Sequence, residues 1–210
     1  GIVLTGTFHT QASRERLASA GIPVVEAWDL SDDGLDMQVG FSHEQVGAAV
    51  AEHFFARGYK RWAVIGVDDP RALRRCNALI QRLDTLGADA VTVQKLPLPA
   101  TWEVGRKGLA NLLDAGEQPD LIFCSSDTVA LGVLAEAATR GLSVPGELAV
   151  LGFGDTLNGQ FANPALSTVS VNATEMGLQV AEALLRRFNG QPAEPRVDTG
   201  FAIIERASTV

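Results

Sequence analysis

Two arginines, Arg71 and Arg75, stand one helical turn apart in a stretch of helical periodicity. A guanidinium group donates hydrogen bonds from a planar fork, which suits a carboxylate or a pair of hydroxyl groups. Ser126, Asp127 and Asp155 each follow an apolar run and could bond further hydroxyl groups. These residue types therefore indicate the binding of a polyol or a sugar acid.

Aromatic side chains offer a second kind of contact. Trp28 follows an apolar run and Trp102 stands at an expected helix start, and an indole ring can stack on the apolar face of a sugar-like ligand. Phe153 lies two residues before Asp155 and belongs to the same turn. Each candidate also has an interpretation without a ligand. The two indoles could pack in the core, and the two arginines could be exposed on a helix. Asp127 could cap a helix instead of contacting a ligand.

Patterns that mark catalysis or metal binding do not occur in the sequence. There is no GxSxG, HExxH, P-loop or complete GxGxxG pattern, which argues against an enzyme. His43 and His53 lie too far apart along one expected helix to share a metal ion. Cys76 and Cys124 stand in apolar surroundings without CxxC spacing, which indicates buried thiols. We expect no metal and no cofactor.

The charge of the chain argues against direct contact with nucleic acid. Its 17 basic and 25 acidic side chains give a net charge of −8, so no clustered positive field is available for phosphate groups. No run is long and apolar enough for a membrane span, which predicts a cytoplasmic protein without a membrane partner. The first residues read as a strand already inside a fold, so the start looks truncated.

Short apolar runs alternate with stretches of helical period, which predicts an α/β fold of parallel sheets flanked by helices. In such sheets ligands bind outside the carboxyl ends of the strands, where the candidate residues stand. The expected strands are residues 2–5, 23–27, 61–66, 90–96, 120–124, 147–152, 168–171 and 201–205. The expected helices are residues 43–57, 71–86, 103–115, 128–140 and 173–188, and 189–196 is an expected loop.

Seven ordered stretches resemble the lactose/galactose-repressor (LacI/GalR) family of transcriptional regulators. The three that weigh most read FCSSDTVALG, GLSVP and VLGFGD, in the order and spacing of the second lobe of that family's sensor domain. The resemblance extends over essentially the whole chain. The seven stretches are residues 21–25, 58–61, 123–132, 141–145, 150–155, 163–169 and 204–209.

The resemblance implies a periplasmic-binding-protein-like (type I) fold of two lobes with the effector in the cleft between them. Residues 1–41 and 171–200 would form an incomplete N-terminal lobe, and residues 42–170 and 201–210 the C-terminal lobe. In that family a helix-turn-helix headpiece and a further βαβ unit precede the region that the chain matches. We therefore expect the headpiece and the first part of lobe one to be missing from these residues.

The resemblance also implies roles for individual residues. Arg75 matches the family's effector-binding arginine, and Ser126 stands where an asparagine usually bonds effector hydroxyls. Gly154 stands where a sugar-binding aspartate is common, and the loss of that carboxylate favours an anionic effector. With residues 39–44, the turn around Gly154 most resembles the gluconate-repressor branch, in which Asp155 becomes the nearby acid.

The function implied is that of an effector-sensing domain of a bacterial repressor. A sugar or sugar acid would close the two lobes and thereby control operator DNA binding, which is allostery between two sites. Partners would be the small-molecule effector, a second copy in a homodimer, and operator DNA through the missing headpiece. The alternative is a transport-type periplasmic sugar-binding protein, which shares the fold.

Overall fold

The computed structural model describes residues 1–210 and divides into two compact units. Unit 1 consists of Gly1–His43 and Val171–Phe201. Unit 2 consists of Glu44–Ser170 and Ala202–Val210. Each unit is an α/β structure built on its own sheet, so the chain passes from one unit to the other three times.

The sheet of unit 1 has four parallel strands in the order β1-β2-β3-β9. Helix α7 (Ala173–Phe188) packs against β2 and β3 and buries Met176, Val180 and Ala183. Helix α1 (Gln11–Ser19) buries none of its residues. The strands are β1 (Ile2–Thr5), β2 (Val24–Ala27), β3 (Met37–Gly40) and β9 (Arg196–Asp198).

The sheet of unit 2 has six strands in the order β10-β8-β7-β6-β4-β5. Five of them are parallel, and β10 pairs antiparallel with β8, which differs from the purely parallel sheet expected. The strands are β4 (Trp62–Val67), β5 (Thr92–Leu96), β6 (Leu121–Cys124), β7 (Ala149–Phe153), β8 (Ser167–Ser170) and β10 (Ala202–Ile204).

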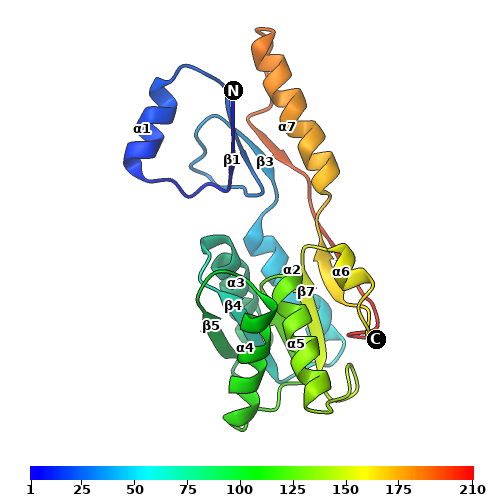
Figure 1. Ribbon diagram of the computed structural model, residues 1–210. Helices are drawn as coiled ribbons and strands as arrows, with labels where there is room; N and C mark the ends of the chain where they lie inside the picture. The colour runs from blue at the N-terminus through cyan, green and yellow to red at the C-terminus, as the bar shows by residue number, and fades with distance from the viewer. The chain divides into compact units, whose positions relative to one another are not determined.

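Helices cover both faces of the unit 2 sheet, so its central strands are apolar along their whole length. Ala63 and Ile65 of β4 belong to the core under α4 (Trp102–Asp114) and α5 (Asp127–Thr139), whereas Trp62 and Val64 point to the opposite face. Helices α4 and α5 lie side by side (Figure 1). The remaining helices are α2 (His43–Ala56), α3 (Pro70–Leu86) and the short α6 (Leu157–Gln160).

Glycines let the helices of unit 2 approach one another closely. A Cβ atom on Gly132 of α5 would lie 2.0 Å from the carbonyl oxygen of Trp102 at the start of α4. A Cβ atom on Gly47 of α2 would lie 2.2 Å from the carbonyl oxygen of Arg75 on α3. The first turn of α4 and the Arg75 turn of α3 are therefore held in place by direct backbone contacts.

The five helices expected from periodicity all form, with ends within one residue of those predicted. The capping side chains explain these ends: Asn172 accepts from the amide of Glu175 at the start of α7, and Ser126 accepts from that of Val129 at the start of α5. Gly87, at φ 77°, ends α3. The helices α1 and α6 and the strands β3 and β9 were not predicted.

The last residues of the chain are built into unit 2. The backbone amide of Ser167 donates to Oγ of Ser208 at 2.7 Å, and that hydroxyl donates to the carbonyl oxygen of Val150 at 2.6 Å. Ser208 and Thr209 are both buried. Ser208 therefore joins the amino ends of the neighbouring strands β7 and β8.

Candidate functional site

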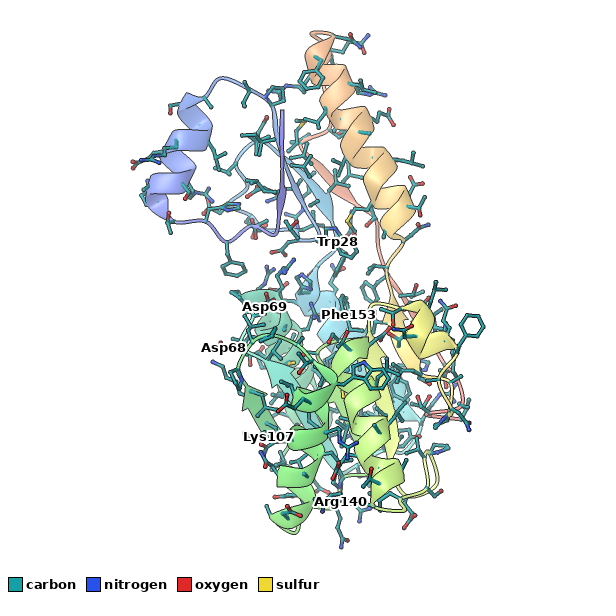
Figure 2. The ribbon with its side chains drawn as sticks, in the orientation of Figure 1. Trp28, Asp68, Asp69, Lys107, Arg140 and Phe153 are labelled. Atoms are coloured by element: carbon teal, nitrogen blue, oxygen red, sulfur yellow. The ribbon has the colours of Figure 1, made fainter.

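Arg75 is the cation around which the candidate site of unit 2 is built. Its side chain is only 5% exposed, and its guanidinium group donates to the carbonyl oxygen of Ser125 at 2.9 Å. Its Cζ lies 3.7 Å from the ring centroid of Phe153, a stacked cation–π contact (Figure 2 labels Phe153). Ser125 follows β6 and Phe153 ends β7, so Arg75 joins the carboxyl ends of two neighbouring strands.

A buried and stacked guanidinium group is well suited to bind an anion or paired hydroxyl groups. Its orientation is fixed before a ligand arrives, so little conformational entropy is lost on binding. Arg75 and Phe153 were each predicted to bind the ligand, and the structure shows that they are in contact with each other, which the sequence did not indicate.

Ser126 directly precedes α5 and lies at the same edge of the sheet. Its hydroxyl oxygen accepts the backbone amide of Val129 at 3.3 Å, which makes it the N-cap of α5. A hydroxyl group that accepts one hydrogen bond can still donate one. Ser126 thus combines a structural role with a donor available at the carboxyl end of β6.

Asp127 is a buried structural acceptor in this structure. It is 1% exposed, and its two carboxylate oxygens accept from the hydroxyl of Thr168 and from the backbone amide of Thr156, each at 2.6 Å. A Cβ atom on Gly152 would lie 2.3 Å from Asp127 Oδ1, so glycine is required beside it. The carboxylate therefore ties the first turn of α5 to β8 and to the start of α6.

Asp155 is paired with Arg206, a residue of the closing segment. Its Oδ1 lies 2.6 Å from the guanidinium group of Arg206, and its own backbone has a φ of 54°. Burial alone would raise the pKa of Asp155, but hydrogen bonds from Arg206 and Ser170 outweigh burial and hold the pKa below its usual value. Asp155 is thus an ionised carboxylate that already has a cationic partner.

Arg71 turns back on the N-cap of its own helix. Its side chain lies 3.4 Å from the carboxylate of Asp69, which also accepts the backbone amides of Arg71 and Ala72. Burial alone would raise the pKa of Asp69, and these hydrogen bonds lower it. Trp102 begins α4 with half of its surface exposed, and the structure brings its side chain to neither arginine.

Unit 1 carries a second set of polar side chains at the carboxyl ends of its strands. Trp28 follows β2 with a φ of 68°, a left-handed conformation that is rare for a side chain of this size (Figure 2). The hydroxyl of Thr7 donates to the carboxylate of Asp29 at 2.7 Å, and both residues are buried. Backbone strain of this kind clusters at functional sites.

A buried hydrogen bond between a histidine and a glutamate in unit 1 was not predicted. Nε2 of His9 lies 2.8 Å from Oε1 of Glu26, whose side chain is fully buried in β2. The other carboxylate oxygen of Glu26 accepts the backbone amide of Leu35 at 2.9 Å. A glutamate inside the otherwise apolar run of residues 24–27 is the one signal in the sequence that could have indicated a buried partner.

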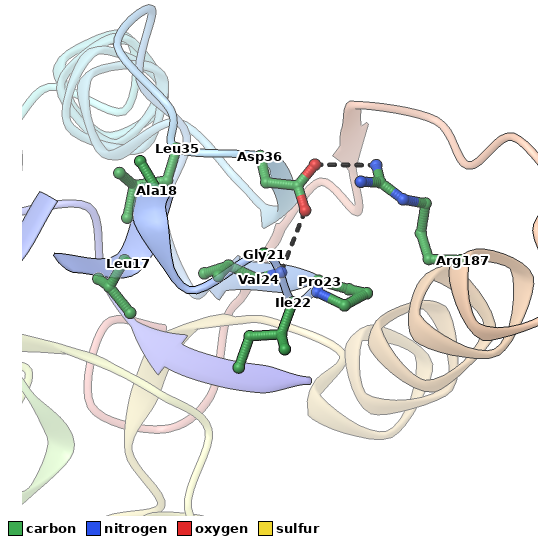
Figure 3. Close-up of a pocket in the computed structure, with 9 residues that line it drawn as sticks. All are labelled: Leu17, Ala18, Gly21, Ile22, Pro23, Val24, Leu35, Asp36 and Arg187. Carbon is green, nitrogen blue, oxygen red and sulfur yellow. Dashed lines mark hydrogen bonds and ion pairs between the residues drawn. The ribbon is translucent and has the colours of Figure 1, made fainter. Parts of the chain in front are cut away.

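A surface hollow of unit 1 lies away from these side chains. It has a volume of about 520 Å³ and is lined by the amino ends of β2 and β3 and the last turns of α1 and α7 (Figure 3). Asp36 contacts Arg187 at 2.9 Å and accepts the backbone amide of Val24 at its wall. We place the candidate site at the carboxyl ends, because the buried polar groups lie there.

Other kinds of site find little support. No group of three or more histidine, cysteine or acidic side chains is placed to hold a metal ion. Cys76 and Cys124 are buried free thiols, as predicted. Burial raises the pKa of Cys76 to about 11 and raises that of Cys124 well above its usual value. None of the helices has the length and apolar character needed to span a membrane.

Two α/β units with polar side chains at the carboxyl ends of parallel strands define a small-molecule-binding domain of the α/β class. Comparison with known proteins supports this class, because residues 51–209 match the family model of the periplasmic binding protein-like domain. The chain belongs to that domain family, in the branch formed by LacI-family transcriptional regulators.

The relatives are transcriptional regulators and not enzymes. The chain is 36% identical over 213 residues to the HTH-type transcriptional regulator GntR of Pseudomonas aeruginosa, and 30% identical over 205 residues to that of Escherichia coli K12. The alignments cover 100% and 97% of the chain. In each case the chain spans 62% of the curated relative's length.

Solved structures show the same fold. The transcription regulator GntR from Chromobacterium violaceum is 34% identical with a TM-score of 0.93, over 100% of this chain and 78% of that one. A LacI family transcriptional regulator from Silicibacter pomeroyi is 28% identical with a TM-score of 0.90, over 98% of this chain and 76% of that one.

Proposed function

We propose that this chain is the effector-sensing domain of a bacterial transcriptional repressor, and that its effector is a sugar acid of the gluconate type. The observation that carries the proposal is the buried guanidinium group of Arg75, stacked on Phe153 at the carboxyl ends of two strands. Ser126 and Trp28 are proposed to contribute a hydroxyl donor and a stacking surface, and Arg71 and Trp102 remain weaker candidates.

The charges around Arg75 favour an acid over a neutral sugar. The carboxylates of Asp69, Asp127 and Asp155 all stand at this edge of unit 2, and each already accepts hydrogen bonds from the protein. Gly154 supplies no carboxylate. A ligand that brings its own carboxylate would offer Arg75 a charged acceptor, and these three carboxylates are engaged by other groups of the protein.

The relatives favour a regulator over a transport protein. The two curated relatives described above are HTH-type regulators and one of the solved structures is a LacI family regulator, and the chain spans less than two thirds of each of those curated relatives. We propose a homodimer in the cytoplasm, with operator DNA contacted by a helix-turn-helix headpiece outside these 210 residues. The net charge of −8 fits this assignment, because the sensing domain itself would not attract phosphate groups.

The test is calorimetric titration of the full chain with gluconate, other sugar acids and neutral sugars, before and after Arg75→Met. Methionine keeps the apolar stem against Phe153 and removes the charge. Losing a hydrogen-bonded charge should weaken sugar-acid binding by about 1.5 to 3 kcal/mol, which is about 10- to 150-fold.

The matched control is Arg82→Met, on the same helix, where Arg82 pairs with Glu52 at 2.8 Å and is 39% exposed. It should bind the sugar acid as the unmodified chain does. An unmodified chain that binds no sugar acid would contradict the proposed effector class. Equal binding by Arg75→Met and the unmodified chain would remove Arg75 from the site.

A further inference from the structure

The imidazole of His9 has one ring nitrogen committed to the protein and one that is not. Its Nε2 lies 2.8 Å from the buried carboxylate of Glu26. Its Nδ1 makes no hydrogen bond within the protein and is not fully buried. With 12% of the side chain exposed, Nδ1 is therefore open to an external partner.

Glu26 determines which nitrogen can accept a hydrogen bond. Its side chain is completely buried, and a buried carboxylate is costly unless its oxygens receive hydrogen bonds. One oxygen accepts from the amide of Leu35 and the other is left for His9. Nε2 of His9 must then carry the hydrogen, which makes Nδ1 of the neutral ring an acceptor.

His9 stands at the edge of the sheet where unit 1 gathers its other polar groups. It lies between the end of β1 and Thr10, the N-cap of α1, and Glu26 belongs to the neighbouring parallel strand β2. The pair formed by Thr7 and Asp29 and the strained backbone of Trp28 follow the same two strands. Ligands of parallel α/β sheets bind outside these carboxyl ends.

We infer that His9 is a specificity-determining residue for the effector, and that its Nδ1 accepts a hydrogen bond from a hydroxyl group of a polyhydroxy acid. Glu26 is the positioning residue that fixes the ring and its tautomer. The inference rests on the proposed function and names a residue of unit 1 that contacts the effector. A site built to bond a hydroxyl group discriminates against an analogue that lacks it, because the polar atom is then left unpaired.

The test compares His9→Gln with the unmodified chain by calorimetric titration with gluconate. The glutamine amide can take the place of Nε2 and still donate to Glu26, whereas nothing replaces Nδ1. We expect an unchanged melting temperature and about tenfold weaker binding. The matched control is His53→Gln in unit 2, where Nε2 of His53 makes the same 2.8 Å contact to Glu205. The control should bind gluconate normally.

Deoxy analogues of gluconate keep the test decisive if His9→Gln also loses stability. The unmodified chain should bind one of the deoxy acids about tenfold more weakly than gluconate, and His9→Gln should bind these two ligands equally. Full affinity of His9→Gln, with Arg75→Met weakened, would overturn the inference and leave the proposed function standing. If every deoxy acid loses as much in the variant as in the unmodified chain, the inference also fails. An unmodified chain that binds no sugar acid would contradict both the inference about His9 and the proposed function.

Discussion

Replacing Asp127 by alanine should destabilise unit 2 more than any surface substitution. The change leaves the hydroxyl of Thr168 and the amide of Thr156 without their acceptor inside a buried region. Each unpaired buried group costs about 1 to 3 kcal/mol, and the lost charge in the first turn of α5 adds about 0.3 to 1 kcal/mol. Thr168 can turn partly to the carbonyl of Val169, at 3.4 Å, so we expect a loss of about 3 to 4 kcal/mol.

Urea unfolding measures this loss. With a slope of about 2 kcal/mol per molar urea, the midpoint for unit 2 should fall by about 1.5 to 2 M. Trp62, buried in that unit, reports the transition through its fluorescence. Asp127→Asn should lose less, because the amide keeps one acceptor oxygen.

Glu103→Ala is the matched control, because Glu103 is the exposed first-turn acid of the neighbouring helix α4. It should lose only the contribution of the helix dipole, about 0.3 to 1 kcal/mol. If Asp127→Ala unfolds at the same urea concentration as Glu103→Ala, the carboxylate does not join α5 to β8 and α6 as described. A variant that keeps its stability but loses sugar-acid binding would make Asp127 a ligand contact after all.

Two further predictions concern titration and reactivity. The pKa of Asp155 is lowered in the folded state, so its pairing with Arg206 stabilises the fold fully above pH 3.8, the usual pKa of an aspartate. That contribution is lost as the pH falls through the folded-state pKa. Asp155→Asn should therefore flatten the acid side of a curve of stability against pH, and an unchanged curve would refute this. Burial raises the pKa of both Cys76 and Cys124. Neither thiol should therefore react with a maleimide at pH 7 in the native chain, and both should react in urea. Fast labelling of the native chain would show that the core around the two thiols opens.

Most of the fold could be predicted from local patterns. The strands of unit 2 are covered on both faces, so each reads as a short continuous apolar run, as residues 121–124 do. The helices with an apolar stripe were recognised from their helical period. Helix α1 was missed because it buries no residue and so has no apolar period to detect, and β9 was missed because two of its three residues are charged.

Less of the candidate site could be predicted, because its contacts join distant residues. A cation at Arg75 was predicted, but its stacking on Phe153 and its bond to Ser125 depend on how α3 packs against two strands. The pair formed by His9 and Glu26 joins a loop residue to a residue of β2 that lies 17 positions further along the chain. Residue type alone does not indicate such pairs, since a carboxylate gives no sign of which cation will reach it.

The route of the chain through its two units bears on how the protein folds during synthesis. Strand β3 completes its pairing only when residues 196–198 arrive as β9, and the amino ends of β7 and β8 are joined through Ser208. Both sheets are thus completed only by segments that lie far along the sequence, and until β9 arrives β3 keeps an unpaired edge that invites association with other chains. We expect the folding rate of each unit to be limited by these pairings between segments that are distant in sequence.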